Sequence, residues 1–330
     1  MKRIIKIFLL VLTILFLLFL GVFFLKRYPK NENMIWGVSF SPEYAQYLGL
    51  DVKETYRVIL DDYKFKYLRL TARWDDIQTQ KDKFDFSQID YFIDEATKRN
   101  DKVILAIGQK TPRWPECNIP DWANNLSDSD YFSALNNYLQ ATAEHYKNNP
   151  TVEIVQVENE PFLAFGATCH VLDKEKFQAE INTVKKVDPV RPVLVTDSGE
   201  LSLWNKTANV SDLFGSTVYR VVWNKFTGYI GYNWLPATYF RWRAWWHGRD
   251  LKTAFVAELQ AEPWLPDRAI SEGNIAEQFK SMNLDRLQRN ISFAEETGFS
   301  RAYFWGAEWW YWLEKHGDPE IGNYIRNLKK

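Results

Sequence analysis

The chain has few of the side chains that most often bind metals or act as nucleophiles, with 4 His and 2 Cys among 330 residues. The histidines are His145, His170, His247 and His316, which are scattered along the chain without metal-ligand spacing. Two thiols are too few for a zinc cluster built from cysteines. We therefore expect neither a metal ion nor an organic cofactor.

Glycine-rich phosphate loops are also missing, because neither G-x-G-x-x-G nor G-x-x-x-x-G-K occurs in the sequence. This argues against a doubly wound nucleotide-binding sheet. The chain has no excess of positive charge either, since its formal net charge is -1. Electrostatics therefore give no reason to expect a nucleic-acid partner.

Charge is absent from a long run near the N-terminus. Residues 7–25 contain no charged side chain, and Lys and Arg residues flank the run on both sides. A helix of about 20 apolar residues spans a bilayer, and no small-x-small cleavage site follows this one. We expect residues 1–30 to form an uncleaved transmembrane anchor, with a cleaved signal peptide as the alternative. Residues 31–330 would then form one extracytoplasmic domain, which we expect to be a monomer.

After this segment, short apolar runs alternate with stretches of helical periodicity. The runs predict eight strands, at 35–40, 66–71, 102–108, 152–158, 192–197, 212–219, 253–259 and 302–305. The main predicted helices are 52–63, 87–100, 130–147, 173–187 and 274–298. Strands that alternate with helices pair in parallel through right-handed crossovers, and eight such units close into a (β/α)₈ barrel. The predicted fold class is therefore α/β, a (β/α)₈ barrel preceded by one N-terminal transmembrane helix.

One segment, residues 221–250, interrupts this rhythm and is rich in aromatic residues. In it Trp242, Trp245 and Trp246 have helical spacing, which predicts packing in the core. Because arginines lie nearby, an interfacial or membrane-facing position is the alternative. The chain as a whole contains 15 Trp and 17 Tyr, and some of these rings are expected to line a cleft for flat apolar ligands such as sugar faces.

Polar side chains stand where two of the predicted strands end. The stretch "VQVENEPF" (155–162) places Glu158, Asn159 and Glu160 directly before a proline, and the seventh strand, "TAFVAELQ", carries Glu258 near its end. In a parallel barrel the carboxyl ends of all strands surround one opening, where active sites lie. Glu160 and Glu258 are therefore predicted to meet there across a bound molecule.

Two carboxyl groups about 5–5.5 Å apart suit retaining glycoside hydrolysis, in which one attacks the anomeric carbon and the other donates a proton to the leaving oxygen. A single strand-end glutamate could equally form a structural ion pair with an Arg or Lys of the barrel. Glu262, four residues beyond Glu258, is a weaker alternative nucleophile. Glu158 and Glu308 are expected to have supporting or structural roles.

These residues resemble a known group of enzymes. The "VENEPF" stretch is similar to the Asn-Glu-Pro signature of the clan A glycoside hydrolases, which are retaining (β/α)₈ barrels, and the wider pattern most resembles family 5, the cellulase and mannanase family. The resemblance implies that Glu160 is the acid/base, that Glu258 is the nucleophile, and that Asn159 binds the sugar 2-hydroxyl.

The same resemblance implies three further contacts. Arg69 in "YLRLT" matches an arginine near the nucleophile, Tyr219 matches a tyrosine that hydrogen-bonds it, and Trp305 matches the tryptophan at the floor of the sugar subsite. The chain departs from the family where histidines are usual, near the third and sixth strands. Trp114 or Gln109 is the candidate substitute near the third strand.

The two cysteines, Cys117 and Cys169, follow the third and fourth strands. Adjacent loops at one opening can bring them within disulfide reach, and export would permit the bond. The alternative is two buried free thiols.

These observations predict a membrane-anchored, extracytoplasmic glycosidase that cleaves a β-linked oligosaccharide or polysaccharide. Transglycosylation, in which a sugar replaces water as acceptor, is not distinguished from hydrolysis. The alternative from another class is a non-catalytic carbohydrate-binding or envelope scaffold protein on the same barrel. The sugar, the linkage and endo or exo action are not specified by the sequence.

Overall fold

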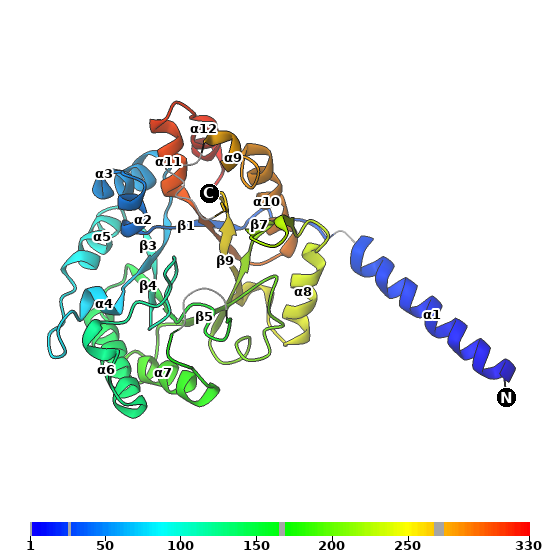
Figure 1. The fold of residues 1–330 in the computed structure, drawn as a ribbon, viewed down its shortest axis with the longest axis horizontal. Helices are drawn as coiled ribbons and strands as arrows, with labels where there is room; N and C mark the ends of the chain where they lie inside the picture. The colour runs from blue at the N-terminus through cyan, green and yellow to red at the C-terminus, as the bar shows by residue number, and fades with distance from the viewer. Residues whose placement is uncertain (1, 26–27, 165–168, 267–273) are drawn as a thin grey trace.

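The computed structural model describes residues 2–25, 28–164, 169–266 and 274–330. Eight parallel strands close into a barrel around the centre of Figure 1. In chain order they are β1 (Ile35–Ser39), β2 (Tyr67–Thr71), β3 (Lys102–Ile107), β4 (Val152–Val157), β5 (Val193–Asp197), β6 (Leu213–Val218), β9 (Ala254–Gln260) and β10 (Arg301–Trp305). The predicted (β/α)₈ barrel is therefore confirmed, and β1 pairs with β10 to close it.

Helices surround the barrel, and capping side chains mark the start of several of them. They are α2 (Pro42–Tyr47), α3 (Val52–Arg57), α4 (Trp74–Ile77), α5 (Ser87–Thr97), α6 (Asp128–Tyr146), α7 (Lys174–Val187), α8 (Ala237–Trp246), α9 (Ile275–Gln278), α10 (Leu284–Thr297), α11 (Ala307–Lys315) and α12 (Glu320–Asn327). Ser127 and Asp173 cap α6 and α7 by accepting a hydrogen bond from a backbone N–H in the first turn. A small antiparallel hairpin, β7 (Val221–Asn224) with β8 (Gly228–Gly231), is inserted after β6.

The interior of the barrel is filled by its own cluster of side chains: Ile104, Ile154, Leu194, Phe255 and Tyr303. Alternation along each strand separates this cluster from the larger core that lies between the strands and the helices. Gly37 leaves room for it, because a Cβ there would come within 2.4 Å of the Tyr303 ring.

The predicted helix 274–298 is wrong in its continuity, because the structure divides it into α9 and α10. The break is stabilised by two side chains. Ser281 exchanges hydrogen bonds with the backbone of Trp264, and Asn283 caps the new helix by accepting from the Arg286 N–H. Such side-chain bonds to the backbone compete with helix continuation.

The predicted core packing of the α8 tryptophans is also wrong for two of them. Trp245 is 71% exposed and Trp246 is 64% exposed, whereas Arg243 on the same helix is buried. The Arg243 guanidinium lies 3.7 Å from the Trp204 ring centroid and donates a hydrogen bond to the carbonyl oxygen of Gly199. These contacts stabilise a buried arginine on the face of α8 where the spacing of apolar residues predicted tryptophan.

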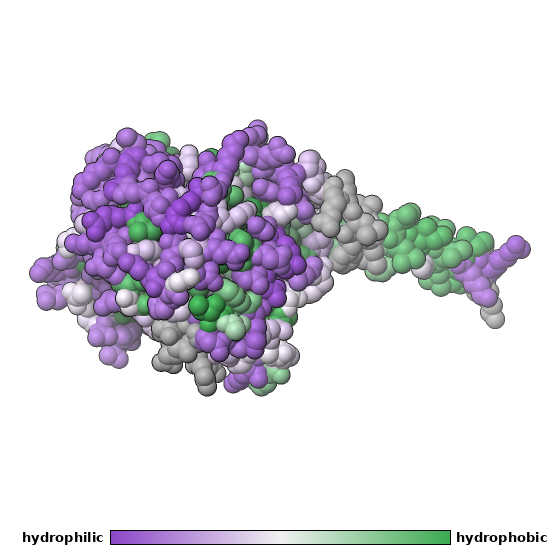
Figure 2. Space-filling model, turned by 90° about the horizontal axis from the view of Figure 1, so that it is seen from above, coloured by the Kyte–Doolittle hydropathy of each residue, from purple (hydrophilic) through white to green (hydrophobic). Residues whose placement is uncertain are grey.

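The N-terminal helix α1 (Lys2–Leu25) projects away from the barrel, as Figures 1 and 2 show. Many of its apolar side chains are exposed, from Ile5 to Leu18, and near its C-terminal end Phe23 contacts Tyr239 of α8. Within the described residues, no helix meets the combined length and hydropathy of a membrane-crossing segment. The predicted transmembrane anchor is therefore not supported.

Candidate active site

The backbone turns sharply where β4 ends. Glu158 has φ 60° and Glu160 has φ 46°, both in the left-handed region that residues other than glycine rarely adopt. The regular alternation of the strand therefore stops after Val157, and Glu158 and Glu160 make separate sets of contacts. Strained backbone of this kind persists where surrounding interactions fix it, often at functional sites.

Glu158 holds the loop that follows β3. Its carboxylate accepts hydrogen bonds of 2.7 Å from the backbone N–H groups of both Gln109 and Lys110. Gly108, with φ 138°, makes this approach possible, because a Cβ there would lie 2.4 Å from the Glu158 carboxylate. Glu158 therefore has a structural role, fixing the position of the β3 loop against the end of β4.

A second buried carboxyl group, Glu180 of α7, faces Glu158. Its two oxygens have no hydrogen-bond partner among the described groups as long as both carboxyls are ionised. A proton shared between them satisfies both groups. Burial is the main cause that raises the pKa of Glu158 to about 7, and burial together with the charge of Glu158 raises the pKa of Glu180.

Arg69 of β2 connects the ends of β4 and β9. Its Nη1 donates to Glu258 Oε1 at 2.8 Å, its Nη2 donates to Asn159 Oδ1 at 2.8 Å, and its Nε donates to Gln156 Oε1 at 2.8 Å. Tyr219, which follows β6, donates its hydroxyl to the other oxygen of Glu258 at 2.8 Å. The side chains of Arg69 and Glu258 are almost fully buried. These two donors stabilise the ionised form of Glu258.

Glu160 lies in a different electrostatic environment. Thr217 of β6, at the position where the family usually has histidine, donates to Glu160 Oε1 at 3.1 Å. Burial raises the pKa of Glu160 well above its usual range, and the charges of Glu258 and Glu116 raise it further. The effect of Glu258 on Glu160 means that the two predicted catalytic carboxyls act on one another within the same site.

Glu116 and Lys110 belong to this site and were not predicted. Glu116 accepts a 3.3 Å hydrogen bond from Asn159 Nδ2 and lies 3.3 Å from the Lys110 ammonium. Lys110 also donates to the backbone carbonyl of Glu160 at 3.1 Å. Both come from the loop after β3. The signal in the sequence that could have pointed to them is Lys110, a charged residue shortly after the apolar run of β3.

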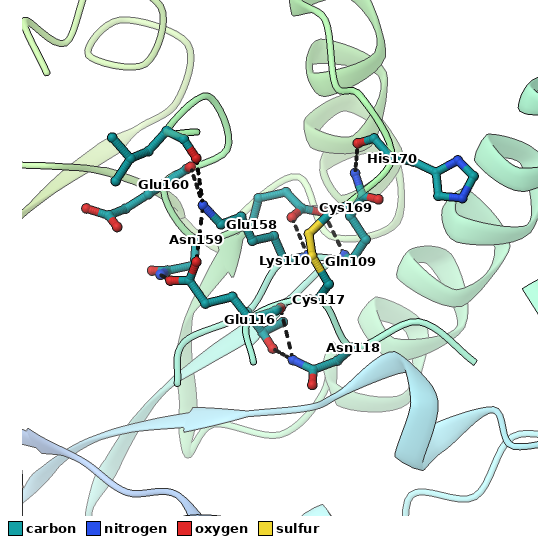
Figure 3. Close-up of a disulfide and its surroundings, with 12 residues drawn as sticks. Gln109, Lys110, Glu116, Cys117, Asn118, Glu158, Asn159, Glu160, Cys169 and His170 are labelled. Atoms are coloured by element: carbon teal, nitrogen blue, oxygen red, sulfur yellow. Dashed lines mark hydrogen bonds and ion pairs between the residues drawn. A yellow bond between two sulfur atoms is a disulfide. The ribbon is translucent and has the colours of Figure 1, made fainter. Parts of the chain in front are cut away.

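The disulfide between Cys117 and Cys169 lies beside these groups, as Figure 3 shows. The two Cα atoms are 5.4 Å apart, and the bond joins the loops that follow β3 and β4. Glu116 immediately precedes Cys117, so the bridge ties the loop that carries Glu116 to the loop that follows Glu160. The pairing considered from the sequence is the one present.

Trp305, which ends β10, is buried and has a cation over its ring. The Arg113 guanidinium lies 4.1 Å from the Trp305 ring centroid and 3.7 Å from that of Tyr44. Arg113 also forms an ion pair with Glu262, and Glu308 lies 3.9 Å away. The charge of Glu262 is therefore engaged by Arg113, whereas Glu258 is engaged by Arg69 and Tyr219.

Trp114 is the most exposed of the predicted site residues. Its side chain is 67% exposed, and among the described residues it makes no hydrogen bond with the carboxylates of the site. Gln109, the other candidate at this position, is buried and accepts from the Tyr131 hydroxyl at 2.7 Å. A role for Trp114 in sugar binding stays a prediction. Among the described residues no group of three or more His, Cys, Asp or Glu side chains is arranged to hold a metal ion.

Comparison with known protein families identifies the chain. A family model described as cellulase, glycosyl hydrolase family 5, matches residues 29–233. The chain belongs to glycosyl hydrolase family 5. The matched region includes Arg69, Asn159, Glu160 and Tyr219 and ends before Glu258. The resemblance seen in the sequence is thereby confirmed at the level of the family.

Solved structures share the fold of this family 5 protein at low sequence identity. Xylanase 10B from Thermotoga petrophila RKU-1, in complex with xylobiose, is 16% identical with a TM-score of 0.56, over 85% of this chain and 86% of that one. A GH5_18 protein from Streptomyces cattleya, in complex with GlcNAc, is 14% identical with a TM-score of 0.56, over 84% and 71% of the two chains.

A variant of a GH5_18 protein from Bifidobacterium longum, in complex with Manb1-4GlcNAc, is 11% identical with a TM-score of 0.59, over 82% of this chain and 68% of that one. No curated protein sequence matches the chain significantly. Membership of the family supports glycosidase activity on an oligosaccharide or polysaccharide.

Proposed function

We propose that the protein is a retaining glycoside hydrolase that cleaves a β-linked glycan by double displacement. The observation that carries the proposal is the contrast between two neighbouring glutamates. Glu258 accepts hydrogen bonds from Arg69 and Tyr219, which favour its charged form. Glu160 has a raised pKa because it is buried and close to other carboxylates, which favours its protonated form. One protonated carboxyl, as the acid, and one ionised carboxylate, as the nucleophile, are what this reaction requires.

In the first step a carboxylate oxygen of Glu258 forms a bond to the anomeric carbon. The bond between that carbon and the glycosidic oxygen breaks, and the leaving oxygen takes the proton of Glu160. In the second step Glu160, now ionised, takes a proton from water, and the hydroxide oxygen displaces Glu258 from the anomeric carbon. Each glutamate ends the cycle in its starting protonation state.

Asn159 is proposed to bind the sugar hydroxyl next to the anomeric carbon. Its Oδ1 accepts from Arg69 at 2.8 Å and from Thr196 at 3.2 Å, so the amide orientation is fixed with Nδ2 directed towards Glu116. One hydrogen of Nδ2 is engaged by Glu116 and the other is available for a ligand. Glu116 is therefore proposed as a residue that positions Asn159.

The site is proposed to work outside the cytoplasm. Disulfide bonds form and persist in oxidising compartments, and Cys117 and Cys169 are joined next to the proposed catalytic carboxyls. The disulfide supports an exported domain. It gives no information on whether that domain is attached to a membrane.

A screen of aryl β-glycosides and β-glycans tests the proposal, with wild type, Glu160→Ala and Glu258→Ala compared side by side. We expect wild-type hydrolysis that both substitutions abolish or strongly reduce, with retention of anomeric configuration by NMR. Hydrolysis that survives both substitutions, or a product of inverted configuration, would contradict it. No turnover of any substrate by wild type would instead favour the non-catalytic carbohydrate-binding protein.

A further inference from the structure

A cavity of about 170 Å³ lies outside the catalytic site, between the segment that follows β8, the first turn of α8 and helix α10. Its lining includes Arg220, Asn233, Trp234, Thr238 and Glu296. Arg220 directly follows Tyr219, which donates its hydroxyl to Glu258. The cavity is therefore close to the catalytic residues in sequence, although its walls are made by other elements.

Arg220, the cation of this cavity, forms no ion pair within the part of the chain that the structure describes. Arg220 is 6% exposed, and its Nη1 atom is buried without a hydrogen-bond partner among the described residues. No carboxylate of the described chain lies within ion-pair distance of its guanidinium, and Glu200 acts on it only over a longer range. The guanidinium lies over the Phe293 ring, 4.0 Å from its centroid. Burial lowers the pKa of Arg220 to about 10, so it stays charged at neutral pH.

A buried charge of this kind is costly unless a partner compensates it. The contact with Phe293 supplies part of the compensation, since cation–π contacts are favourable when desolvated. A guanidinium can donate five hydrogen bonds, and the Nη1 group has none. An oxyanion in the cavity would compensate the charge of the guanidinium.

A second feature of the cavity also favours an anion. Helix α8 begins beside it, and Ala237 and Thr238 of its first turn contribute to the lining. Pro236 occupies the N-cap position and provides no side-chain cap, and the first turn contains no acidic residue. The N-terminal end of a helix attracts negative charge through its exposed N–H groups and its dipole.

We propose that this cavity is a binding site for a carboxylate group. The single positive charge of Arg220 balances one negative charge, which favours a singly charged carboxylate over a phosphate dianion. Trp234 stands at the cavity and is 64% exposed, so a flat apolar ring is available beside the bound anion. A ring of this kind packs against the face of a sugar. An acidic sugar is therefore the favoured source of the carboxylate, with a free organic acid as the other source.

Calorimetric titration of the full chain tests the site, with acetate, glucuronate, inorganic phosphate and methyl glucoside as ligands at constant ionic strength. We expect saturable binding of acetate and glucuronate and weaker binding of phosphate. Arg220→Met should lower the affinity for the carboxylates by at least about tenfold, because a charge-assisted hydrogen bond is lost. Arg220→Lys keeps the positive charge and should therefore retain part of the affinity for the carboxylates.

Arg191→Met is the control for removal of a partly buried arginine elsewhere in the fold. Arg191 also has a buried Nη1 without a partner, but it does not line this cavity. Its substitution should leave carboxylate affinity unchanged. Tighter binding of glucuronate than of acetate identifies an acidic sugar as the ligand, and equal binding identifies a free acid.

A pair of surface substitutions keeps the test valid if Arg220→Met does not fold. Asn233 and Asn125 are both exposed, and only Asn233 lines the cavity. Asn233→Asp should weaken carboxylate binding several-fold by charge repulsion, and Asn125→Asp should not. Absence of carboxylate binding by wild type, or equal affinity in the Asn233→Asp and Asn125→Asp variants, overturns the proposal. Because none of these residues contacts Glu160 or Glu258, this result is separate from the outcome of the glycosidase assay.

Discussion

Around Glu160 the nearest charged side chains are mostly carboxylates, whereas Glu258 is held by the buried guanidinium of Arg69. This difference arises at the scale of single residues, because it depends on which side chain each strand end presents to the opening. Thr217 can donate only one weak neutral hydrogen bond to Glu160. This hydrogen bond lowers the pKa of Glu160, but burial and the charges of Glu258 and Glu116 outweigh it and raise that pKa.

Replacing Glu160 should have an effect that depends on the leaving group. Glu160→Ala is expected to lower kcat/KM by about 10²–10⁴-fold for substrates with a poor leaving group, because general acid catalysis is lost. The loss should be smaller for an aryl glycoside with a strongly activated leaving group, which departs without protonation. Rates for a series of aryl β-glycosides measure this dependence.

Glu258→Ala should be inactive towards every member of that series, because the covalent step is lost. Glu262→Ala is the control, since Glu262 is a buried carboxylate just beyond the end of β9 and pairs with Arg113 instead. An inactive Glu262→Ala beside an active Glu258→Ala would assign the nucleophile to Glu262.

Replacing Glu116 should move the pH dependence of the reaction. The charge of Glu116 is one of the causes that raise the pKa of Glu160. In Glu116→Gln that charge is gone and Lys110, whose charge lowers the pKa of Glu160, loses its carboxylate partner. Both changes lower the pKa of Glu160, so the alkaline limb of kcat/KM should shift to lower pH. A profile whose alkaline limb stays in place would show that Glu116 does not act on Glu160.

At the scale of elements, the disulfide ties the loops after β3 and β4, which are 52 residues apart at the bridged positions. Replacing both cysteines with serine should lower the free energy of unfolding by about 2–4 kcal/mol, mainly through greater freedom of the unfolded chain. Denaturant titration of the double variant, and of wild type with and without reductant, measures this. Equal stability of oxidised and reduced wild type would contradict it.

The buried pair formed by Glu158 at the end of β4 and Glu180 of α7 should make stability fall as pH rises. The pKa of Glu158 is about 7 in the folded protein and near 4.5 when unperturbed. Between these two pH values Glu158 keeps its proton in the folded protein and loses it in the unfolded chain. The stability that this group contributes is therefore fully present below about pH 4.5, and it decreases as the pH rises to about 7.

Glu180→Gln should reduce this dependence, because its amide can donate to an ionised Glu158 without a proton. Melting temperatures at about pH 5 and about pH 8 should differ less in this variant than in wild type. Glu175→Gln, an exposed position on the same helix, is the matched control. An undiminished difference in Glu180→Gln would place the pH dependence elsewhere.

At the scale of the whole molecule, α1 and the barrel differ in surface character, as Figure 2 shows. The exposed apolar side chains of α1 favour self-association in water. A chain that begins at residue 31 should therefore elute as a smaller species in size-exclusion chromatography, with an unchanged melting temperature, because Asn31 and the residues after it retain their contacts with the barrel. A large drop in melting temperature on truncation would show that α1 stabilises the barrel.

The barrel was predictable from the sequence because its strands are covered on both faces and read as short apolar runs. The convergence of Glu160 and Glu258 was predictable because strand ends in a barrel share one opening. Glu116 was not, since it lies in a loop whose path depends on the disulfide and on Glu158. The inward position of Arg243 was not predictable either, because apolar periodicity does not register a cation that packs between aromatic rings.

The cluster around Tyr303 and Phe255 fills the barrel interior, so the described strands enclose no channel through the barrel. Incoming glycan, reacting water and both released pieces must use the same entrance. A cleaved fragment that lingers there blocks the next substrate. Slowing of the reaction as its own products accumulate is therefore a consequence of the architecture itself.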